Sequence, residues 1–169
     1  MKGIKAGKFE AYEDSFFSYA YTSKELENSR LEYIYTPPEG GPSESVKLSS
    51  MDIHAYSIKG MWYFDKRQGE LKYRLLALAP MTWDNASNKS IPIDQSTGKP
   101  LAKDDETLIP LFWVFYPAAR NLLHKAKVFN PKNSMQPISF DHLLNARRFS
   151  GVIVQEDNIY DNRKIEKYV

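Results

Sequence analysis

The feature that most constrains the fold is a pair of strand-like segments, Ile53 to Asp65 and Leu71 to Pro80, joined by a short polar stretch. Alternate residues from Leu71 to Ala77 are apolar and fall on one face, because successive side chains of a strand point to opposite faces. The connection "DKRQG" fits a hairpin loop, since Gly69 tolerates a positive φ angle. From Leu76 onwards both faces are apolar. The pattern therefore predicts a β-hairpin whose second strand passes from the surface into a core.

A second constraint is the stretch "LFWVFYPAAR", which begins at Leu111 with an unbroken apolar and aromatic run. Four aromatics and an arginine gathered for a ligand are one interpretation. A central strand, Leu111 to Tyr116, that leads into an amphipathic helix is the simpler one and is favoured. Pro110 fits the first position of this strand, and Pro117 the first helical turn, where its missing N–H is not needed. The predicted buried stripe of the helix is Ala118, Ala119, Leu122, Leu123 and Ala126, and its predicted outward face is Arg120, Asn121, His124 and Lys125.

Two further helices are indicated by their ends. Thr22 and Glu25 have the spacing of a capping box, which predicts a helix from about Ser23 to Tyr33. Ser139 is the predicted cap of the other helix. Its supporting residues are Asp141 in the first turn, Ile138 and Leu143 as a hydrophobic staple, Arg147 and Arg148 in the last turn, and Gly151 as its end.

Shorter patterns complete the expected fold. Lys8 to Tyr12 reads as a strand, and "GVIVQE", residues 151–156, as a buried strand followed by a polar, partly helical tail. The sequence thus predicts one α+β domain over residues 1–169, with a mostly antiparallel sheet packed by about three helices.

Two polar segments interrupt these elements. Thr36 to Ser45 is rich in Pro, Gly and Ser and is predicted to be a loop, and we extend the candidate loop to Ser50. Asp84 to Thr107 has little periodicity, and irregular segments of this length are usually functional or mobile.

Composition excludes several classes of function. The net charge is +2, from 23 basic and 21 acidic residues, so a nucleic-acid partner has no electrostatic support. The absence of cysteine rules out disulfides, cysteine nucleophiles and thiolate metal sites. No apolar run has the length of a membrane helix. The aromatic share of 14% favours a β-containing protein with packed partners.

No arrangement of residues proves catalysis. His54, His124 and His142 lie far apart in the sequence and belong to no metal or nucleophile motif. A hydrolase would need His54 or His142 to meet a carboxylate of Asp104 or Asp105, whose acidic cluster is more simply a solvated loop. We therefore expect neither a catalytic residue nor a cofactor.

A glycan-binding module is the other alternative. Either Trp62 or Trp83 would stack on a sugar ring. In "WYF", however, only Trp62 and Phe64 share a side of a strand. Such a platform is small, so a core or a partner surface is favoured for these aromatics.

The order of several longer segments points to one family. "IKAGKFEAY", "WYFDKRQGELKYRLLALAP", "LFWVFYPAARNLLHKAKVFNPKNS" and "SFDHLLNARRF…VQEDNIYD" follow one another between Ile4 and about Tyr168. The chain resembles the gliding-motility GldN family, also called PorN. The most specific marks are Trp62-Tyr63-Phe64-Asp65, Phe112-Trp113 with Tyr116-Pro117 and Ala119-Arg120, Val128 to Asn133, and Ser139 to Asp141.

The resemblance implies a non-enzymatic periplasmic component of the type IX secretion system, peripherally associated with the outer membrane and without a cofactor. Members join a lipoprotein partner (GldK or PorK) in a large ring and contact the periplasmic part of the motor subunit (GldM or PorM). A closed ring of identical subunits needs two complementary patches on each. We expect these patches in the two polar segments, 36–50 and 84–107, and on the helix face around Arg120 and His124. The candidate interaction residues are Trp62, Trp83, Asp104, Asp105, Arg120 and His124.

Family members carry a signal peptide and a further segment before "IKAGKFEAY". We therefore expect residues 1–169 to be the core of a longer protein.

Overall fold

The computed structural model describes residues 9–35, 42, 44–83, 108–130, 133, 135–157 and 162–164. Contacts between residues divide the chain into two compact units, Met1–Leu122 and Leu123–Val169. The fold is α+β, as the sequence predicts, and the described part holds a mostly antiparallel sheet and three α-helices.

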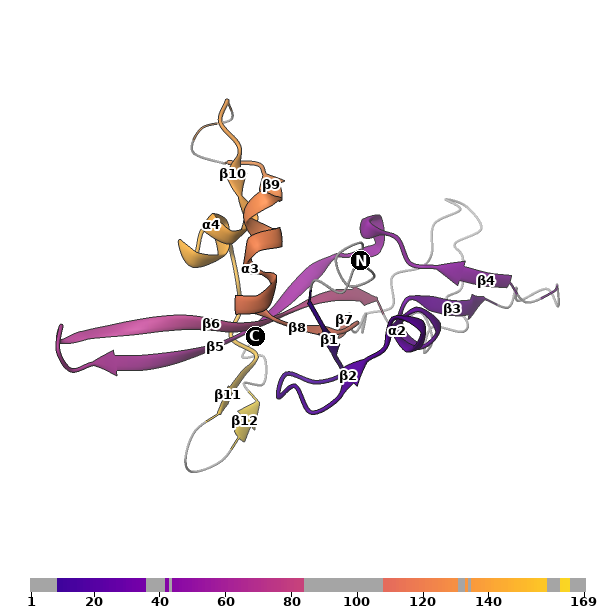
Figure 1. The fold of residues 1–169 in the computed structure, drawn as a ribbon, viewed down its shortest axis with the longest axis horizontal. Helices are drawn as coiled ribbons and strands as arrows, with labels where there is room; N and C mark the ends of the chain where they lie inside the picture. The colour runs from indigo at the N-terminus through magenta and orange to yellow at the C-terminus, as the bar shows by residue number, and fades with distance from the viewer. Residues whose placement is uncertain are drawn as a thin grey trace, which may run out of the picture. The chain divides into compact units, whose positions relative to one another are not determined.

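The first unit is built on a six-stranded sheet in the order β2-β1-β8-β6-β5, with β7 also paired to β6 (Figure 1). Its strands are β1 (Ala11–Tyr12), β2 (Ala20–Tyr21), β5 (Ala55–Asp65), β6 (Glu70–Trp83), β7 (Leu108–Pro110) and β8 (Trp113–Phe115). The predicted hairpin is confirmed, because β5 and β6 pair from Ala55 with Met81 to Asp65 with Glu70. Gly69 has a φ angle of +68° in the connection. The strand expected at Lys8 to Tyr12 is shorter in the described residues and consists of β1 alone.

The register places one layer of apolar side chains across four strands. Ala11 lies opposite Val114, Val114 opposite Leu78, and Leu78 opposite Ile58. Directly opposed residues share a face of the sheet, and the first three of these are buried. Further buried β6 residues are Leu75, Ala77 and Ala79. The second strand of the hairpin therefore enters the core at the position that its pattern predicts.

The opposite face of the sheet is covered by the loop between β1 and β2. Lys59, Ala77 and Phe115 oppose one another in the row next to the apolar layer. Phe17 of the loop stands edge-on to Phe115, with ring centroids 5.3 Å apart, and edge-on to Tyr12 at 5.1 Å. Ala77, in the middle of this row, is fully buried.

The loop itself holds an unusual backbone conformation. Phe17 has a φ angle of +63°, a left-handed conformation that non-glycine residues rarely adopt. Asp14 stabilises the turn, because its carboxylate accepts hydrogen bonds from the backbone N–H and the hydroxyl of Ser18 at 2.9 and 2.7 Å. Lys59 Nζ lies 3.4 Å from the centre of the Phe16 ring. Ring contacts and hydrogen bonds together hold the loop against the sheet.

A helix and a second hairpin complete the first unit. The capping box is confirmed at α2 (Ser23–Arg30): the Glu25 N–H donates to Thr22 Oγ1 and the Thr22 N–H to Glu25 Oε2. The helix ends at Arg30, so its predicted extension to Tyr33 is wrong.

Strand pairing explains this earlier end. Residues of β3 (Glu32–Tyr35) pair with β4 (Glu44–Lys47), which satisfies their backbone groups in a hairpin. The prediction of a loop from Thr36 to Ser45, extended to Ser50, is accordingly wrong at Glu44–Lys47, and its residues 36–41 and 43 lie outside the described residues. A short 3₁₀ helix, η1 (Ser50–Asp52), follows β4.

The apolar run from Leu111 is not a single strand. Pro110 ends β7 rather than opening a strand, and Tyr116 begins helix α3 (Tyr116–Lys125). Between the β7 and β8 pairings with β6, the Leu111 N–H still donates to the Pro80 carbonyl at 2.9 Å, but proline has no N–H with which to return the bond, so the ladder is interrupted there. Leu111 and Phe112 are nevertheless buried, and β8 lies between β1 and β6. The core interpretation is confirmed.

Helix α3 buries a narrower stripe than predicted. Tyr116 and Ala119 are buried and Leu123 is half-buried, whereas Ala118, Leu122 and Ala126 are exposed. A full stripe would require the helix to be covered along its whole length. The predicted outward residues are all exposed: Arg120, Asn121, His124 and Lys125.

The second unit contains two short hairpins and one helix. Its elements are β9 (Lys127–Val128), β10 (Ile138–Ser139), α4 (Phe140–Asn145), β11 (Gln155–Asp157) and β12 (Asn162–Lys164), with β9 paired to β10 and β11 to β12. The predicted cap is confirmed, because the His142 N–H donates to Ser139 Oγ at 3.1 Å. The helix ends before Gly151, contrary to the prediction.

Arg147 ends α4 in place of a glycine. Its φ angle is +52°, its N–H donates to the Leu144 carbonyl, and the Arg148 N–H donates to the Leu143 carbonyl. These two bonds form a Schellman motif, in which a left-handed residue follows the helix. The predicted positions of Arg147 and Arg148 in the last turn are therefore wrong.

The segment 151–156 was expected to be a buried strand, and this is wrong. Val152, Ile153 and Val154 are exposed and irregular, and only Gln155 and Glu156 enter β11. Backbone pairing with β12 starts at Gln155, after the apolar residues, so this pairing does not bury Val152, Ile153 and Val154. The described tail residues, Asn162–Lys164, form a strand rather than a helix.

Candidate protein-interaction surface

The outer half of the β5–β6 hairpin presents several exposed apolar side chains close together. We call Gly60–Asp65, Glu70–Leu75 and their connection the β5–β6 arm. The pairings of β8 with β6 end at Ala77, and no other described strand pairs with the arm. Figure 1 shows the arm as a two-stranded ribbon that continues beyond β8. An isolated two-stranded ribbon is marginally stable in water, so its side chains must stabilise it.

A β-bulge at the base of the arm sets which residues share a face. Lys59 lies opposite Ala77, but Gly60 lies opposite Leu75, so Leu76 is an extra residue on β6. Such a bulge twists the strand pair locally. It separates the buried part of the hairpin from the arm.

One face of the arm is apolar. Trp62 lies opposite Tyr73, and Phe64 opposite Leu71. Together with Leu75, which is buried at the base, these four residues form what we call the apolar face. The exposed fractions of Trp62, Phe64 and Leu71 are 51%, 60% and 64%. Contiguous exposed apolar side chains on a soluble protein mark an interaction site more often than isolated ones do.

The opposite face of the arm is mixed in charge. Lys72 Nζ lies 3.0 Å from Asp65 Oδ2 and 4.0 Å from Glu70 Oε2. The Arg74 guanidinium lies over the Tyr63 ring, 5.8 Å from its centre. Including the connection, the arm carries four basic and two acidic side chains, a net charge of +2.

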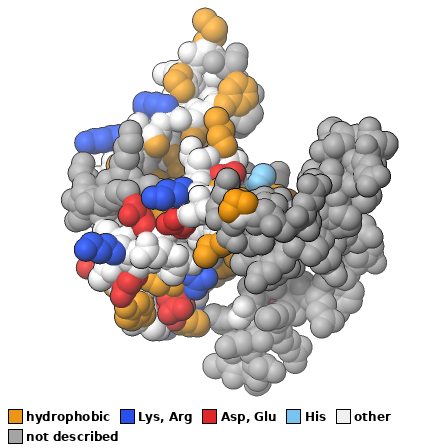
Figure 2. All heavy atoms as spheres, turned by 90° about the vertical axis from the view of Figure 1, so that its right-hand side faces the viewer, with side chains coloured by type: hydrophobic (Ala, Val, Ile, Leu, Met, Phe, Trp, Pro, Cys, Tyr) orange, Lys and Arg blue, Asp and Glu red, His pale blue; other side chains and the backbone are white. Residues whose placement is uncertain are grey.

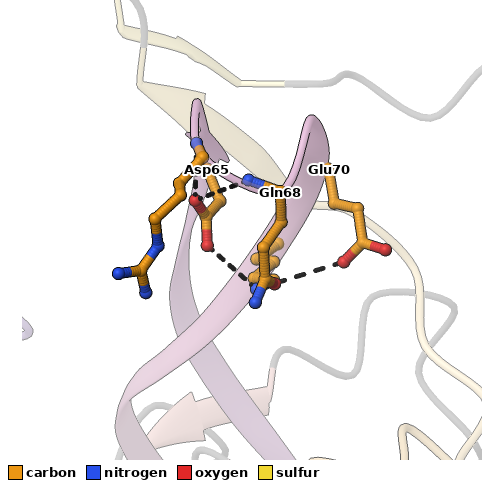
Figure 3. Close-up of polar contacts among 5 residues, drawn as sticks. Asp65, Gln68 and Glu70 are labelled. Atoms are coloured by element: carbon orange, nitrogen blue, oxygen red, sulfur yellow. Dashed lines mark hydrogen bonds and ion pairs between the residues drawn. The ribbon is translucent and has the colours of Figure 1, made fainter.

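The tip of the arm is fixed by one carboxylate (Figure 3). Asp65 Oδ1 accepts hydrogen bonds from the backbone N–H groups of Arg67 and Gln68 at 3.0 and 3.2 Å. The Gly69 N–H donates to the Asp65 carbonyl at 2.8 Å. Hydrogen bonds from the Lys72 side chain and then the Gln68 N–H lower the pKa of Asp65, and Asp65 raises the pKa of Lys72. This network holds the turn in one conformation.

The structure separates the two tryptophans proposed for glycan binding. Trp62 packs on Tyr73, with ring centroids 5.1 Å apart. Trp83 is the last residue of β6, is half-buried and packs beside His54 with centroids 5.3 Å apart. Tyr73 and Trp83 are ten positions apart on β6, roughly 33 Å at the usual rise of a strand. The two tryptophans therefore do not form a common platform.

The other candidate residues fall in different places. Arg120 and His124 are exposed on α3. His124 Nδ1 lies 4.0 Å from Oδ2 of Asp141, which is buried at the first turn of α4. Asp104 and Asp105 lie outside the described residues, as does the whole segment 84–107.

Metal ligands give no second candidate in the described part, and the face shown in Figure 2 has no patch of one charge. In the view of Figure 2, the described acidic and basic side chains are interspersed, with apolar side chains between them. Within the described ranges, no cluster of three or more His, Asp or Glu side chains is suited to hold a metal ion. His54 and His142 are exposed, and the carboxylates proposed to join them lie outside the described ranges.

Sequence reasoning missed most of the apolar face. The sequence pattern indicates that Trp62 and Phe64 share one side of a strand and that Leu71, Tyr73 and Leu75 share one face of the next, but it does not report whether another element covers them. The alternation itself was visible. Adding the hairpin register to it would have placed these residues on one surface.

The fold and the exposed arm define an α+β protein that presents an apolar surface on a hairpin. A model of the family described as Gliding motility associated protein GldN matches residues 1–169, the whole chain, so the chain belongs to this family. The family consists of components of the gliding motility and type IX secretion machinery and is not a known enzyme family. No curated protein matches the chain.

A further finding concerns membranes. Among the described helices, none has the length and apolar character needed to cross a bilayer.

Proposed function

We propose that the chain is a non-enzymatic scaffold subunit of the type IX secretion and gliding machinery, located in the periplasm at the outer membrane. In this proposal it forms a ring with a lipoprotein partner of the GldK or PorK kind. It also contacts the periplasmic domain of a GldM- or PorM-like motor subunit. The match of the GldN family model to the whole chain carries the proposal.

Residues 1–169 act as one core in this assembly, because the family match runs through both compact units. A scaffold subunit works through surfaces, and the exposed arm supports this role. The proposed contact residues are Trp62, Trp83, Asp104, Asp105, Arg120 and His124. Of these, Trp62, Arg120 and His124 are exposed.

The test is size-exclusion chromatography with light scattering, on the chain alone and mixed with the periplasmic domain of each partner. A stable complex with at least one partner is expected. Arg120→Glu should weaken the complex if α3 contributes, whereas Lys24→Glu makes the same charge change on α2 and serves as the control. A chain that remains monomeric with both partners would contradict the proposal.

Glycan binding is the second candidate, favoured only by the exposed Trp62 ring beside Tyr73. A titration with peptidoglycan fragments, monitored by tryptophan fluorescence, distinguishes glycan binding from the scaffold function. A saturating shift that is lost in Trp62→Ala would favour the glycan.

A further inference from the structure

Along one edge, the backbone of β5 in the arm pairs with no strand of the described part of the chain. In the described sheet β5 is the last strand, with β6 as its only neighbour there. Along Gly60–Asp65 one edge of its backbone pairs with β6, and the other is paired with no described strand. Exposed strand edges are templates for pairing with another chain, and proteins usually protect them.

This edge lacks the usual protection. From Met61 to Phe64 it carries four large uncharged side chains, and all four are exposed. The β6 edge of the same arm differs, because Lys72 and Arg74 alternate with its apolar residues. Charged side chains at an edge discourage further pairing. The asymmetry selects β5 as the edge that accepts another strand.

The two faces of the arm specify the side chains of such a strand. Alternate residues of an added strand would extend the apolar face beside Trp62 and Phe64, where apolar residues fit. The intervening residues would lie on the other face, beside Tyr63, over whose ring Arg74 lies at 5.8 Å. The arm has a net charge of +2, which favours acidic residues at these positions.

We propose that the β5 edge of the arm, Gly60–Asp65, binds an extended acidic segment of a partner protein by strand addition, with apolar residues of the segment alternating with Asp or Glu. Backbone hydrogen bonds supply the affinity, and the two faces supply the sequence preference. The proposal goes beyond the ring function, because it rests on the edge, the exposure and the charge of the arm.

The experiment uses the whole chain and a blocked synthetic peptide of alternating valine and glutamate, long enough to cover Gly60–Asp65. Hydrogen exchange of the backbone amides is followed by NMR. At a peptide concentration ten times the Kd, outward-facing amides of Gly60–Asp65 should exchange about tenfold more slowly. Amides of β3 and β4 should be unchanged and show that the fold is intact.

Two N-methylated peptides distinguish strand addition from other contacts. Each carries N-methyl groups at alternate residues, in one of the two possible phases. In an antiparallel pair, alternate residues direct their N–H groups towards the neighbouring strand. One methylated peptide should therefore bind like the parent and the other should not bind. Equal binding by both, or no binding by the parent, would overturn the proposal.

Charge preference is tested with Arg74→Glu. This variant should bind the glutamate peptide about threefold more weakly, and a valine–lysine peptide about threefold more tightly, the scale of one exposed charge interaction, because the Arg74 guanidinium lies over Tyr63 and not directly opposite the added strand. Lys24→Glu is the matched control and should bind both peptides as the original chain does. An unchanged preference in Arg74→Glu would overturn the acidic specificity.

A second copy of the chain is the competing occupant of this edge. If the arm amides of the free chain are already protected and light scattering shows a dimer, the edge pairs with itself and the proposal is wrong. Because the probe is a synthetic peptide, failure of this test leaves the ring proposal standing. Failure to join the secretion partners likewise leaves strand addition standing.

Discussion

The ring of Tyr73 on β6 occupies the space into which a side chain at Gly60 on β5 would project. A Cβ atom added at Gly60 would overlap the hydroxyl end of this ring. The ring would then have to turn away and lose its contact with Trp62, whose ring centroid lies 5.1 Å from that of Tyr73. A glycine at the base of the arm thus decides where the aromatic residues of the apolar face lie.

Gly60→Ala should lower the free energy of unfolding by about 1–2 kcal/mol, the scale of overpacking a filled position. Urea unfolding measures this cost. In the Tyr73→Ala background the same change should cost much less, because the overlapping ring is absent. Equal costs in both backgrounds would show that the ring does not require the glycine.

Gly69→Ala should lower the free energy of unfolding by about 1 kcal/mol through backbone strain alone. The φ angle of Gly69 is +68°, and no atom lies within 4 Å of a Cβ built there. Asparagine tolerates this conformation better than alanine, so Gly69→Asn should cost less in the same measurement. A Gly69→Ala variant as stable as the original chain would contradict the strain argument.

Arg147→Gly should be more stable than Arg147→Ala by about 1 kcal/mol. Both variants lose the arginine side chain. Their difference in stability therefore isolates the steric cost of the backbone conformation at residue 147, whose φ angle is +52°. Glycine adopts the left-handed end of a Schellman motif without the steric cost of a Cβ atom. Thermal unfolding of the two variants is the measurement, and a more stable Arg147→Ala would refute the motif's role.

Acid should destabilise the first unit below about pH 4, near the ordinary pKa of Asp and Glu carboxyl groups. Hydrogen bonds lower the pKa values of three groups: Asp14 by Ser18, Glu25 by Thr22, and Asp65 by Lys72. A lowered pKa in the folded state stabilises the fold above the unfolded pKa, and this stabilisation is lost as pH falls through the folded pKa.

Thermal unfolding at pH 7 and at pH 3 measures this loss of stability. Lys72→Met removes the largest cause of the Asp65 shift, so the variant should lose less stability between the two pH values than the original chain. An identical loss in both would mean that Asp65 does not contribute to the acid response.

Local chemistry made much of the fold predictable. The Thr22–Glu25 box and the Ser139 cap are short patterns whose physics acts within a few residues, and both are confirmed. Gly69 and the alternation around it likewise predicted the long hairpin. Strand β3 was missed because Glu32–Tyr35 follows a helix without a glycine or proline between them.

The remaining errors concern relations between distant segments. Whether Leu71 is covered depends on where β8 stops pairing with β6, and no pattern within β6 reports that. The same holds for Val152 to Val154, whose apolar run reads as core although it is exposed. An apolar pattern identifies a face that avoids water, but it does not distinguish a core from a docking surface.

The topology of the sheet also sets an order of folding. The β5–β6 hairpin closes over a four-residue connection, whereas the pairing of Ala11 with Val114 joins residues about a hundred positions apart. Short loops close with a smaller loss of chain entropy and on a faster timescale than long ones. Loop closure therefore favours formation of the hairpin before β1 and its Phe17 loop dock on the sheet. During that interval the chain already presents the exposed β5 edge from Met61 to Phe64, which is the kind of edge that invites pairing with other chains.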